Sequence, residues 1–431
     1  MTKTSNKPVV CVVGMGYVGL PLAAVAASKG YEVYGYDTDE AKLELIKSGI
    51  TPFKEEFLEK LLPEVKGKLH VFSDAPNFMH KCDINIICVP TPVDEKYFPD
   101  LTPVINASKT VADNMKKGAL VILESTVNPG VSEEIVRPIF EKAGFTVGED
   151  VFIAHCPERV NPGDPKWNVS NIPRVVGSFD EIGLERAKDF YESIVDAKIM
   201  PMKSIREAEA VKITENSFRD INIAFVNELA KSFDRMNIDV KNVIEGASTK
   251  PFAFMAHWPS CGVGGHCIPV DPYYLIEKAK ENDFDHVFLR AARNINNSMP
   301  AYTVEILQDL LNKIEKSLKG SKIGMLGMSY KANVSDLRES PSFKIIKALK
   351  AHDATAEIFD PYTPNHSTVE SLDELLEKSE ALIIATNHKE FINIPVEKFT
   401  KHGIKVIVDG KNCLNKEEIE RHGIIYKGIG R

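Results

Sequence analysis

Short apolar runs alternate with helix-prone segments along the first part of the chain. Residues 8–13 form a β-branched run, residues 20–29 are rich in alanine, and residues 31–37 alternate apolar with polar side chains. Further apolar runs that each lead into a polar loop span residues 84–89, 120–123 and 152–154. Because strands that alternate with helices are typical of a doubly wound parallel sheet, we predict an α/β domain here.

The pattern becomes helical in the middle of the chain and returns to strands after it. From about residue 204 to 233, apolar side chains recur at three- and four-residue spacings, and a second helical stretch runs from 287 to about 318. Later strands are predicted at residues 323–327, 356–360 and 381–385, and the last clear strand ends at Asp409. The predicted fold class is α/β, with two Rossmann-like doubly wound domains joined by a central helical domain. The predicted domains span residues 1–203, 204–305 and 306–431.

Composition places the chain among ordinary globular proteins of several domains. Its 431 residues are 43% hydrophobic and 26% charged, and the net charge of -8 offers no basic surface for nucleic acid. The seven cysteines include no Cys-x-x-Cys pair, which argues against a disulfide framework and a metal site and favours the cytoplasm. The uncharged stretch 9–27 contains three glycines and a proline, so neither a signal peptide nor a membrane span is predicted.

The turn after the first predicted strand carries glycines at the spacing of a dinucleotide-binding motif. Gly14 permits the turn, Gly16 lets a pyrophosphate approach, and Gly19 lets helix and strand pack closely. Asp37 ends the next strand, where it would bind the adenosine ribose and repel a 2′-phosphate, so NAD is favoured over NADP. The predicted cofactor-binding residues of this region are Gly14, Gly16, Tyr17, Val18, Gly19, Asp37 and Lys42. The alternative is a flavodoxin-like turn that binds nothing.

Polar residues follow three other predicted strands of this domain. In doubly wound sheets the ligand lies at the carboxyl ends of the strands, so Thr91 and Thr126 are predicted to line the nicotinamide half of the site. Their alternative roles are helix caps or turn residues. A third strand end carries the charged pair Glu158 and Arg159.

A cysteine on a glycine-rich turn is the main candidate for covalent chemistry. Cys267 follows Gly264 and Gly265, and Asp271 stands four residues later. A thiolate attacks a carbonyl well and leaves well, and glycines let a substrate come close to the backbone. Asp271 would orient a proton donor or a water. The alternative is a structural cysteine buried in a tight loop.

Other charged and polar candidates lie in the middle and last parts of the chain. Lys212 and Asn216 share one face of the predicted helix 204–233, where the alternative is a solvated pair. Lys331 and Arg338 lie between the first strand and the first helix of the C-terminal domain, where they would bind phosphates or carboxylates. Lys411 is a further candidate of the same kind.

With these motifs assembled, the chain resembles the nucleotide-sugar 6-dehydrogenase family over essentially its full length. This family comprises the UDP-glucose and UDP-N-acetylhexosamine dehydrogenases. The resemblance rests on six motifs in order: residues 14–19 with Asp37, residues 89–92, residues 124–127, residues 157–159, the helix of Lys212 and Asn216, and residues 264–272 with 330–340 behind them.

The resemblance implies a four-electron oxidation of a sugar C6 alcohol to a carboxylate, with two NAD molecules used in turn at one site. Cys267 would trap the aldehyde as a thiohemiacetal, which is oxidised to a thioester that water cleaves. Lys212 and Asn216 would stabilise the developing oxyanion. Asp271, Glu158 and Thr126 would hold and activate waters, and which of them is the base stays open.

The resemblance also implies binding roles and an assembly. The implied substrate-binding residues are Glu158, Arg159, Lys212, Asn216, Lys250, Gly264, Tyr330 and Lys331. Arg338 would lie near NAD. The N-terminal domain would bind NAD, the helical middle would form a homodimer, and the C-terminal domain would bind the UDP-sugar, with neither nucleic acid nor membrane as a partner.

For the sugar, residues 249–255 and 265–275 are most similar to the UDP-N-acetylglucosamine dehydrogenases. The UDP-N-acetylmannosamine dehydrogenases come second, and the UDP-glucose 6-dehydrogenases after them. Two further alternatives stay open. One is a two-electron alcohol dehydrogenase in which Cys267 is structural, and the other is a regulatory NAD-binding protein without turnover.

Overall fold

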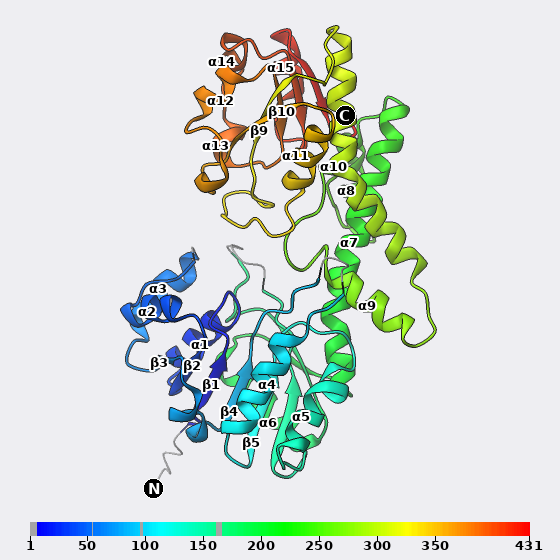
Figure 1. Ribbon diagram of the computed structural model, residues 1–431. Helices are drawn as coiled ribbons and strands as arrows, with labels where there is room; N and C mark the ends of the chain where they lie inside the picture. The colour runs from blue at the N-terminus through cyan, green and yellow to red at the C-terminus, as the bar shows by residue number, and fades with distance from the viewer. Residues whose placement is uncertain (1–6, 54, 95–97, 161–165) are drawn as a thin grey trace. The chain divides into compact units, whose positions relative to one another are not determined.

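The chain, seen here in a computed structural model, divides into two compact units (Figure 1). The structure describes residues 7–53, 55–94, 98–160 and 166–431. The first unit comprises Met1–Glu215 and Tyr273–Asp283, and the second comprises Asn216–Pro272 and Phe284–Arg431. The break at residue 215 falls inside one long helix, so the three domains predicted from the sequence stay a prediction.

The first unit is built on an eight-stranded sheet with the order β3-β2-β1-β4-β5-β6-β7-β8. All neighbouring strands are parallel except β6 and β7. The order from β3 to β6 is that of the Rossmann fold, as predicted. The strands span Val10–Val13 (β1), Val33–Tyr36 (β2), Leu69–Phe72 (β3), Ile84–Ile87 (β4), Ala119–Leu123 (β5), Val151–His155 (β6), Arg174–Ser178 (β7) and Ile199–Pro201 (β8).

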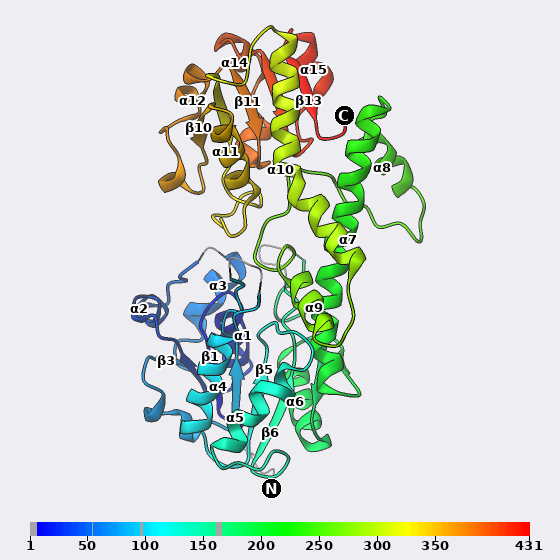
Figure 2. The ribbon, with the colours of Figure 1, turned by 45° about the vertical axis from the view of Figure 1, so that its right-hand side comes forward.

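Helices cover both faces of this sheet, and Figure 2 shows them around the strands. They are α1 (Gly19–Ser28), α2 (Glu40–Ser48), α3 (Glu56–Glu64), α4 (Thr102–Asn114), α5 (Arg137–Lys142) and α6 (Glu181–Ile194), with short turns at Ala75–Asn77, Met79–Lys81 and Ser132–Val136. Alternate residues of β1 enter two different cores: Val10 and Val12 pack in one, Cys11 and Val13 in the other. A strand buried on both faces explains why its sequence reads as one apolar run.

The second unit holds a five-stranded parallel sheet with the order β10-β9-β11-β12-β13. The strands span Lys322–Leu326 (β9), Thr355–Phe359 (β10), Ala381–Ile384 (β11), Val406–Asp409 (β12) and Ile425–Gly428 (β13). The last clear strand of the sequence is β12, which ends at Asp409 as predicted, and β13 follows it. Strand β13 was not predicted, because its sequence contains a lysine and a glycine and does not form an apolar run.

The remaining helices include two long ones. They are α7 (Ile205–Arg235), α8 (Val240–Ser248), α9 (Asp271–Lys280), α10 (Val287–Lys313), α11 (Pro341–Ala351), α12 (Leu372–Lys378), α13 (Lys389–Ile392), α14 (Val396–Lys401) and α15 (Lys416–Arg421), with a turn at Pro364–His366. None of the helices in the described part of the chain has the length and apolar character that a bilayer crossing requires.

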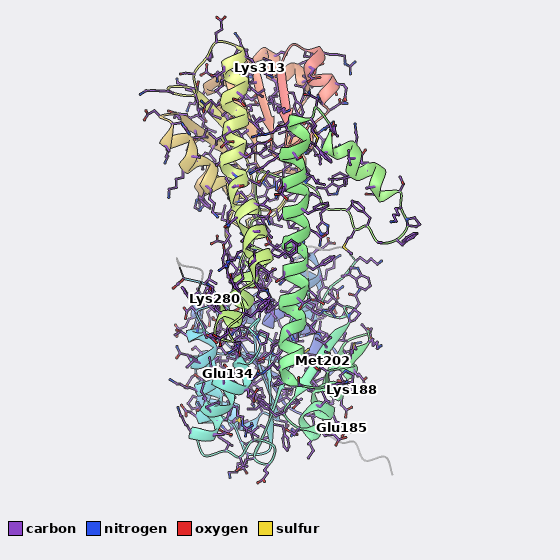
Figure 3. The ribbon with its side chains drawn as sticks, turned by 90° about the vertical axis from the view of Figure 1, so that its right-hand side faces the viewer. Glu134, Glu185, Lys188, Met202, Lys280 and Lys313 are labelled. Atoms are coloured by element: carbon purple, nitrogen blue, oxygen red, sulfur yellow. The ribbon has the colours of Figure 1, made fainter. Side chains whose placement is uncertain are left out.

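Within the second unit, a buried polar network joins α7 to α10, which lie side by side in Figure 3. Arg293 Nη1 is 2.5 Å from Asp220 Oδ1, and the Asn296 side chain donates to the same oxygen at 2.8 Å. Asn296 Oδ1 accepts from the Asn227 side chain at 2.9 Å. Since buried polar groups are costly unless paired, this network specifies how the two helices pack.

A second buried ion pair lies in the first unit, between β5 and β7. Arg174 Nη1 is 2.8 Å from Glu124 Oε1, and both side chains are almost fully buried, at 2% and 0% exposure. The Arg174 guanidinium lies over the Tyr191 ring at 4.9 Å, and the Tyr191 hydroxyl donates to Glu124 at 2.5 Å. Glu124 directly follows β5, so this cluster anchors the end of that strand.

Replacing Arg174 by Met should destabilise the first unit by about 3–5 kcal/mol, because it leaves the Glu124 carboxylate buried without its cation. The chain has two tryptophans, Trp167 in the first unit and Trp258 in the second. In a Trp258→Phe background, the fluorescence of Trp167 during urea unfolding therefore follows the first unit. Adding Glu124→Gln to Arg174→Met should recover part of the loss. An unchanged unfolding midpoint for the single variant would contradict the expectation.

Candidate active site

The glycine turn after β1 gives each of its three glycines a different steric environment. Gly14 has φ of +95°, and a Cβ there would lie 2.8 Å from the Cys88 carbonyl oxygen. A Cβ on Gly19 would overlap the carbonyl oxygen of Gly14. A Cβ on Gly16 would meet no atom within 4 Å, so the space beside it is open. These are the turn, the close packing and the open approach that a dinucleotide motif requires, and NAD fits this geometry.

Asp37 closes this turn from the end of β2. Its Oδ2 accepts from the Met15 N–H at 2.8 Å and from Lys42 Nζ at 2.9 Å, and its Oδ1 accepts from the Asp39 N–H at 3.0 Å. The structure therefore brings Lys42 to Asp37 and ties both to the glycine turn. Val18 immediately precedes α1, and Tyr17 is 44% exposed with its ring stacked on Phe53.

The predicted threonines lie on the loops after two neighbouring strands. The Ser125 hydroxyl donates to the Val89 carbonyl at 2.7 Å, which joins the loop of Thr126 to that of Thr91. Thr91 is 3% exposed, and its carbonyl accepts from the Tyr274 hydroxyl at 2.5 Å. Thr126 is partly exposed. Both threonines stand at the carboxyl edge of the sheet, the edge at which doubly wound sheets bind their ligands, and their contact with the nicotinamide stays a prediction.

Glu158 and Lys212 form a second group of candidates in the first unit. Lys212 Nζ lies 3.8 Å from Glu158 Oε2, and the side chains are 9% and 14% exposed. Burial raises the pKa of the Glu158 carboxyl, whereas the charges of Lys212 and Arg174 lower it. Arg159 is paired with Glu215 and donates to the Pro173 carbonyl at 2.8 Å. A buried carboxyl with a raised pKa next to a lysine is typical of acid–base sites.

The Cys267 turn belongs to the second unit and directly precedes α9. Cys267 is partly exposed, and its carbonyl accepts from the N–H groups of Val270 at 3.1 Å and Asp271 at 2.8 Å. The Asn216 side chain donates to Asp271 Oδ2 at 2.5 Å, and both residues are buried. Asn216 and Asp271 were predicted from the sequence as separate candidates. In the structure a hydrogen bond joins them.

The glycines before the thiol lie against the loop of residues 328–340. A Cβ on Gly264 would lie 2.5 Å from Tyr330 Cβ, and one on Gly265 would lie 2.9 Å from the Tyr330 ring. The Gly265 N–H donates to the Arg338 carbonyl at 2.9 Å. Only glycine allows this close approach. The turn of residues 264–267, called the thiol turn below, is therefore packed tightly against the 328–340 loop.

Charged and titratable side chains also lie on the thiol turn and the loops near it. Arg338 Nη2 is 2.6 Å from Asp336 Oδ2, and the hydrogen bond with Asp336 raises the pKa of the Arg338 guanidinium. Burial and the Arg338 charge lower the pKa of the His266 imidazole. Lys331 is partly buried on the same loop, and Lys250 lies with Nζ 4.9 Å from the Phe252 ring.

The sequence did not indicate three residues that hold these groups in place. Tyr274 bonds the Thr91 loop, and Asp360 and His388 bond the 328–340 loop from behind. The sequence contained one signal for Asp360. It stands at the end of a predicted strand, as Asp37 does in the first unit. Lys411 donates its N–H to Asp409, which places it after β12 as expected.

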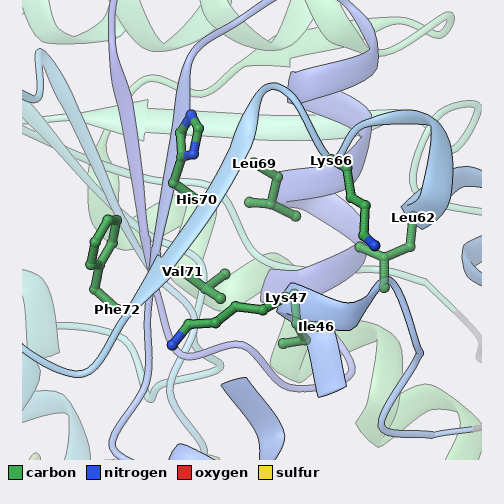
Figure 4. A pocket seen from close by; sticks show the side chains of 8 residues that line it. All are labelled: Ile46, Lys47, Leu62, Lys66, Leu69, His70, Val71 and Phe72. Atoms are coloured by element: carbon green, nitrogen blue, oxygen red, sulfur yellow. The ribbon is translucent and has the colours of Figure 1, made fainter. Parts of the chain in front are cut away.

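The first unit also contains a cavity (Figure 4). Its lining comes from α2, from α3 and the turn after it, and from β3: Ile46, Lys47, Leu62, Lys66, Leu69, His70, Val71 and Phe72. None of them is a predicted site residue. In the described residues, no cluster of His, Cys, Asp and Glu side chains could hold a metal ion.

Three family models match the chain in succession. They describe the UDP-glucose/GDP-mannose dehydrogenase family: its NAD binding domain at residues 8–195, its central domain at 206–298 and its UDP binding domain at 324–416. The chain belongs to this family. It is an NAD-dependent UDP-sugar 6-dehydrogenase, and the alternative of a regulatory NAD-binding protein is set aside.

Similar proteins extend over the whole chain. A UDP-N-acetyl-D-mannosamine dehydrogenase of Pyrococcus horikoshii is 38% identical over 98% of this chain and 99% of its own. A UDP-N-acetyl-D-glucosamine 6-dehydrogenase of Pseudomonas aeruginosa is 37% identical over 95% of this chain and 98% of its own. The solved structure of the UDP-D-ManNAc dehydrogenase from Pyrococcus horikoshii has a TM-score of 0.92 at 37% identity, covering 98% of this chain and 99% of that one.

The glycine turn yields a test of how the cofactor is held. Gly16→Ala should leave the thermal unfolding midpoint unchanged but weaken NAD binding roughly tenfold, because the methyl group occupies the open approach to the turn. Gly19→Ala should lower both stability and NAD affinity, since its Cβ overlaps Gly14. Gly67→Ala, which also meets open space, is the control. Titration of NAD with each variant measures the effect, and wild-type affinity in Gly16→Ala would refute it.

Proposed function

We propose that this enzyme oxidises C6 of a UDP-N-acetylhexosamine to the carboxylate through a thioester on Cys267. The observation that carries the proposal is the Cys267 turn itself. Its thiol is partly exposed, its glycines are packed on Tyr330, and the Asn216–Asp271 pair lies four residues further on. A structural cysteine needs none of these features, whereas a nucleophile needs a fixed turn and a carboxylate close by.

The chemical roles follow from the residue types. NAD bound at the glycine turn supplies the acceptor for each hydride. Cys267 would bond the C6 carbon first as a thiohemiacetal and then, after loss of the second hydride, as a thioester that water cleaves to release the thiol and the acid. Lys212 and Asn216 would donate to the C6 oxygen as negative charge develops on it.

Three carboxylate and hydroxyl groups are candidates for handling protons and water. Asp271 is buried and accepts from Asn216, so its carboxylate is oriented by that bond. Burial raises the pKa of the Glu158 carboxyl, which favours a group that takes up and releases a proton. Thr126 would hold a water. Tyr330, Lys331, Lys250, Gly264 and Arg159 would contact the UDP-sugar, and Arg338 would lie near NAD.

Two sugars are candidates for the substrate. UDP-N-acetylglucosamine is the first candidate, because residues 249–255 and 265–275 are most similar to the dehydrogenases that act on it. UDP-N-acetylmannosamine is the second, because a relative named for it is 38% identical to this chain. The two differ only in configuration at C2, which lies away from the reacting C6.

The assembly we propose is a homodimer formed through the second unit. Phe218 and Phe225 stand seven residues apart on α7, hence on one face, and are 48% and 51% exposed. Phe252, Met255 and Trp258, which follow α8, are also exposed, at 67%, 65% and 47%. Exposed apolar groups of this extent are typical of protein interfaces. The cytoplasm remains the proposed compartment, since all seven cysteines are free thiols.

The oxidation state reached should be visible in the stoichiometry. With a limiting amount of UDP-sugar, the enzyme should form two NADH per sugar, because an alcohol reaches the acid in two hydride transfers. UDP-N-acetylglucosamine, UDP-N-acetylmannosamine, UDP-N-acetylgalactosamine and UDP-glucose are assayed side by side by absorbance of NADH. A ratio near one would establish the two-electron alcohol dehydrogenase instead.

The same assay tests the nucleophile. Cys267→Ser should abolish uronate formation, because a serine hydroxyl is a far weaker nucleophile at neutral pH. Cys261→Ser is the matched control in the same loop, since Cys261 is buried and its Sγ lies 3.5 Å from the Ala385 carbonyl. Wild-type turnover of Cys267→Ser would exclude the thioester.

The dimer is tested by sedimentation velocity. Phe225→Glu should convert the protein to monomer, because a charge in the centre of an apolar interface is costly to bury. Ile182→Glu on α6, where the native side chain is 54% exposed, is the control and should leave the sedimentation coefficient unchanged. A dimer that persists in Phe225→Glu would place the interface elsewhere.

A further inference from the structure

A fully buried acid and histidine lie beneath the 328–340 loop in the second unit. Asp360 follows β10 and His388 follows β11, and both side chains have 0% exposure. His388 Nε2 is 3.2 Å from Asp360 Oδ2. The same oxygen accepts from the N–H groups of Met328 at 2.7 Å and Ser329 at 2.9 Å. The pair therefore meets the loop directly after β9.

The other nitrogen of His388 also bonds the loop. The Asn333 N–H donates to His388 Nδ1 at 2.9 Å, which requires a lone pair on Nδ1 and therefore a proton on Nε2. The Nε2–H then donates to Asp360. Burial acts to raise the pKa of the Asp360 carboxyl, but hydrogen bonds from His388, Ser329 and Met328 hold it well below its usual range. Asp360 is ionised, and a neutral His388 links it to Asn333.

This link holds a residue in the left-handed backbone conformation. Asn333 has φ of +62°, in the left-handed region, which asparagine adopts more readily than most residues other than glycine. Its side-chain oxygen accepts from the Lys389 N–H at 3.1 Å, so Asn333 is bound on two sides by the segment after β11. Such a conformation persists only when its surroundings hold it, and it is found often at ligand sites.

The loop that these bonds fix carries the proposed UDP-sugar contacts. Tyr330 and Lys331 lie between the bonds of Ser329 to Asp360 and of Asn333 to His388. Tyr330 packs against Gly264 and Gly265 of the thiol turn. A shift of Asn333 would therefore move Tyr330 and Lys331, which lie directly before it along the chain.

The first unit shows what His388 adds. There, Asp37 accepts from the Met15 N–H at 2.8 Å, as Asp360 does from Met328, and its second partner is Lys42. A lysine donates to its acid but has no acceptor that could receive a bond from the loop. In the second unit the partner is an imidazole, whose far nitrogen extends the hydrogen bonding to Asn333.

We propose that His388 is a positioning residue for nucleotide binding: its Nδ1 holds Asn333 and thereby sets Tyr330 and Lys331 in the geometry that binds the UDP-sugar. The inference rests on the proposed function, which gives Tyr330 and Lys331 their contact with the UDP-sugar.

Two substitutions of His388 distinguish the role of Nδ1 from that of Nε2. In His388→Asn the side-chain oxygen stands near the position of Nδ1 and keeps an acceptor for the Asn333 N–H. In His388→Gln the amide reaches the position of Nε2 and keeps the donor to Asp360 but not the acceptor. His388→Gln should weaken UDP binding about 3- to 10-fold by isothermal titration calorimetry, as expected for one hydrogen bond. It should raise the KM for the UDP-sugar by the same factor and leave kcat and the NAD affinity within about twofold.

The comparison with His388→Asn decides whether the role is positional. His388→Asn should retain UDP affinity within about twofold of wild type, which a merely structural role would not predict. Equal losses in the two variants, or parallel losses of UDP binding, NAD binding and kcat, would overturn the inference. If glutamine is not tolerated at this buried position, Asn333→Ala is the second test. It keeps the backbone N–H but removes the side-chain bond to Lys389 and places an alanine at φ of +62°, so it should shift residue 333 and weaken UDP binding similarly. Unchanged UDP affinity would show that the position of residue 333 does not set UDP binding and would overturn the inference.

Lys331→Ala separates this inference from the proposed function. If Lys331→Ala leaves UDP affinity unchanged, the UDP contact proposed for the loop is wrong. If Lys331→Ala weakens UDP binding and His388→Gln does not, the contact stands and the positioning role of His388 fails.

Discussion

In both sheets of this chain, one carboxylate holds the loop that follows the opening strand. Asp37 accepts from the Met15 N–H at 2.8 Å in the first unit, and Asp360 accepts from the Met328 N–H at 2.7 Å in the second. Each acid directly follows the strand beside the opening one, and the parallel register brings it next to the loop. A backbone N–H just beyond the end of a buried strand has no partner in the next strand. The carboxylate accepts its hydrogen bond and thereby fixes the direction of the loop.

The two units diverge after this held turn. In the first unit α1 begins at Gly19, so the start of a helix comes within a few residues of the open space beside Gly16. In the second unit α11 begins only at Pro341, and the longer connection becomes the 328–340 loop. The short connection of the first unit suits a pyrophosphate at a helix end. The long loop of the second unit supplies a surface of side chains that packs against the thiol turn.

Local patterns were sufficient to predict most elements, but not the contacts between distant segments. The glycine turn, α1 and α7 were predicted within a few residues, because apolar spacing and glycine positions are properties of neighbouring residues. The bond between Asn216 and Asp271 joins residues 55 positions apart, and no spacing rule indicates it. His388 carries even less signal, since a histidine after a strand looks like any loop residue until Asp360 and Asn333 are seen on either side of it.

Many glycines make the thiol turn an entropically costly place for a nucleophile, because glycine loses more conformational freedom on folding than any other residue. The second unit compensates by bonding the turn and its flanks from separate elements. These bonds are Ser260 to Asn227, Cys261 to Gly410, Gly265 to Arg338 and Asp271 to Asn216. A thiolate reacts efficiently only when it is held close to the carbon it attacks, and misplacement by an ångström is costly. Glycines give the substrate access to the backbone, and the four bonds restore the rigidity that glycines remove.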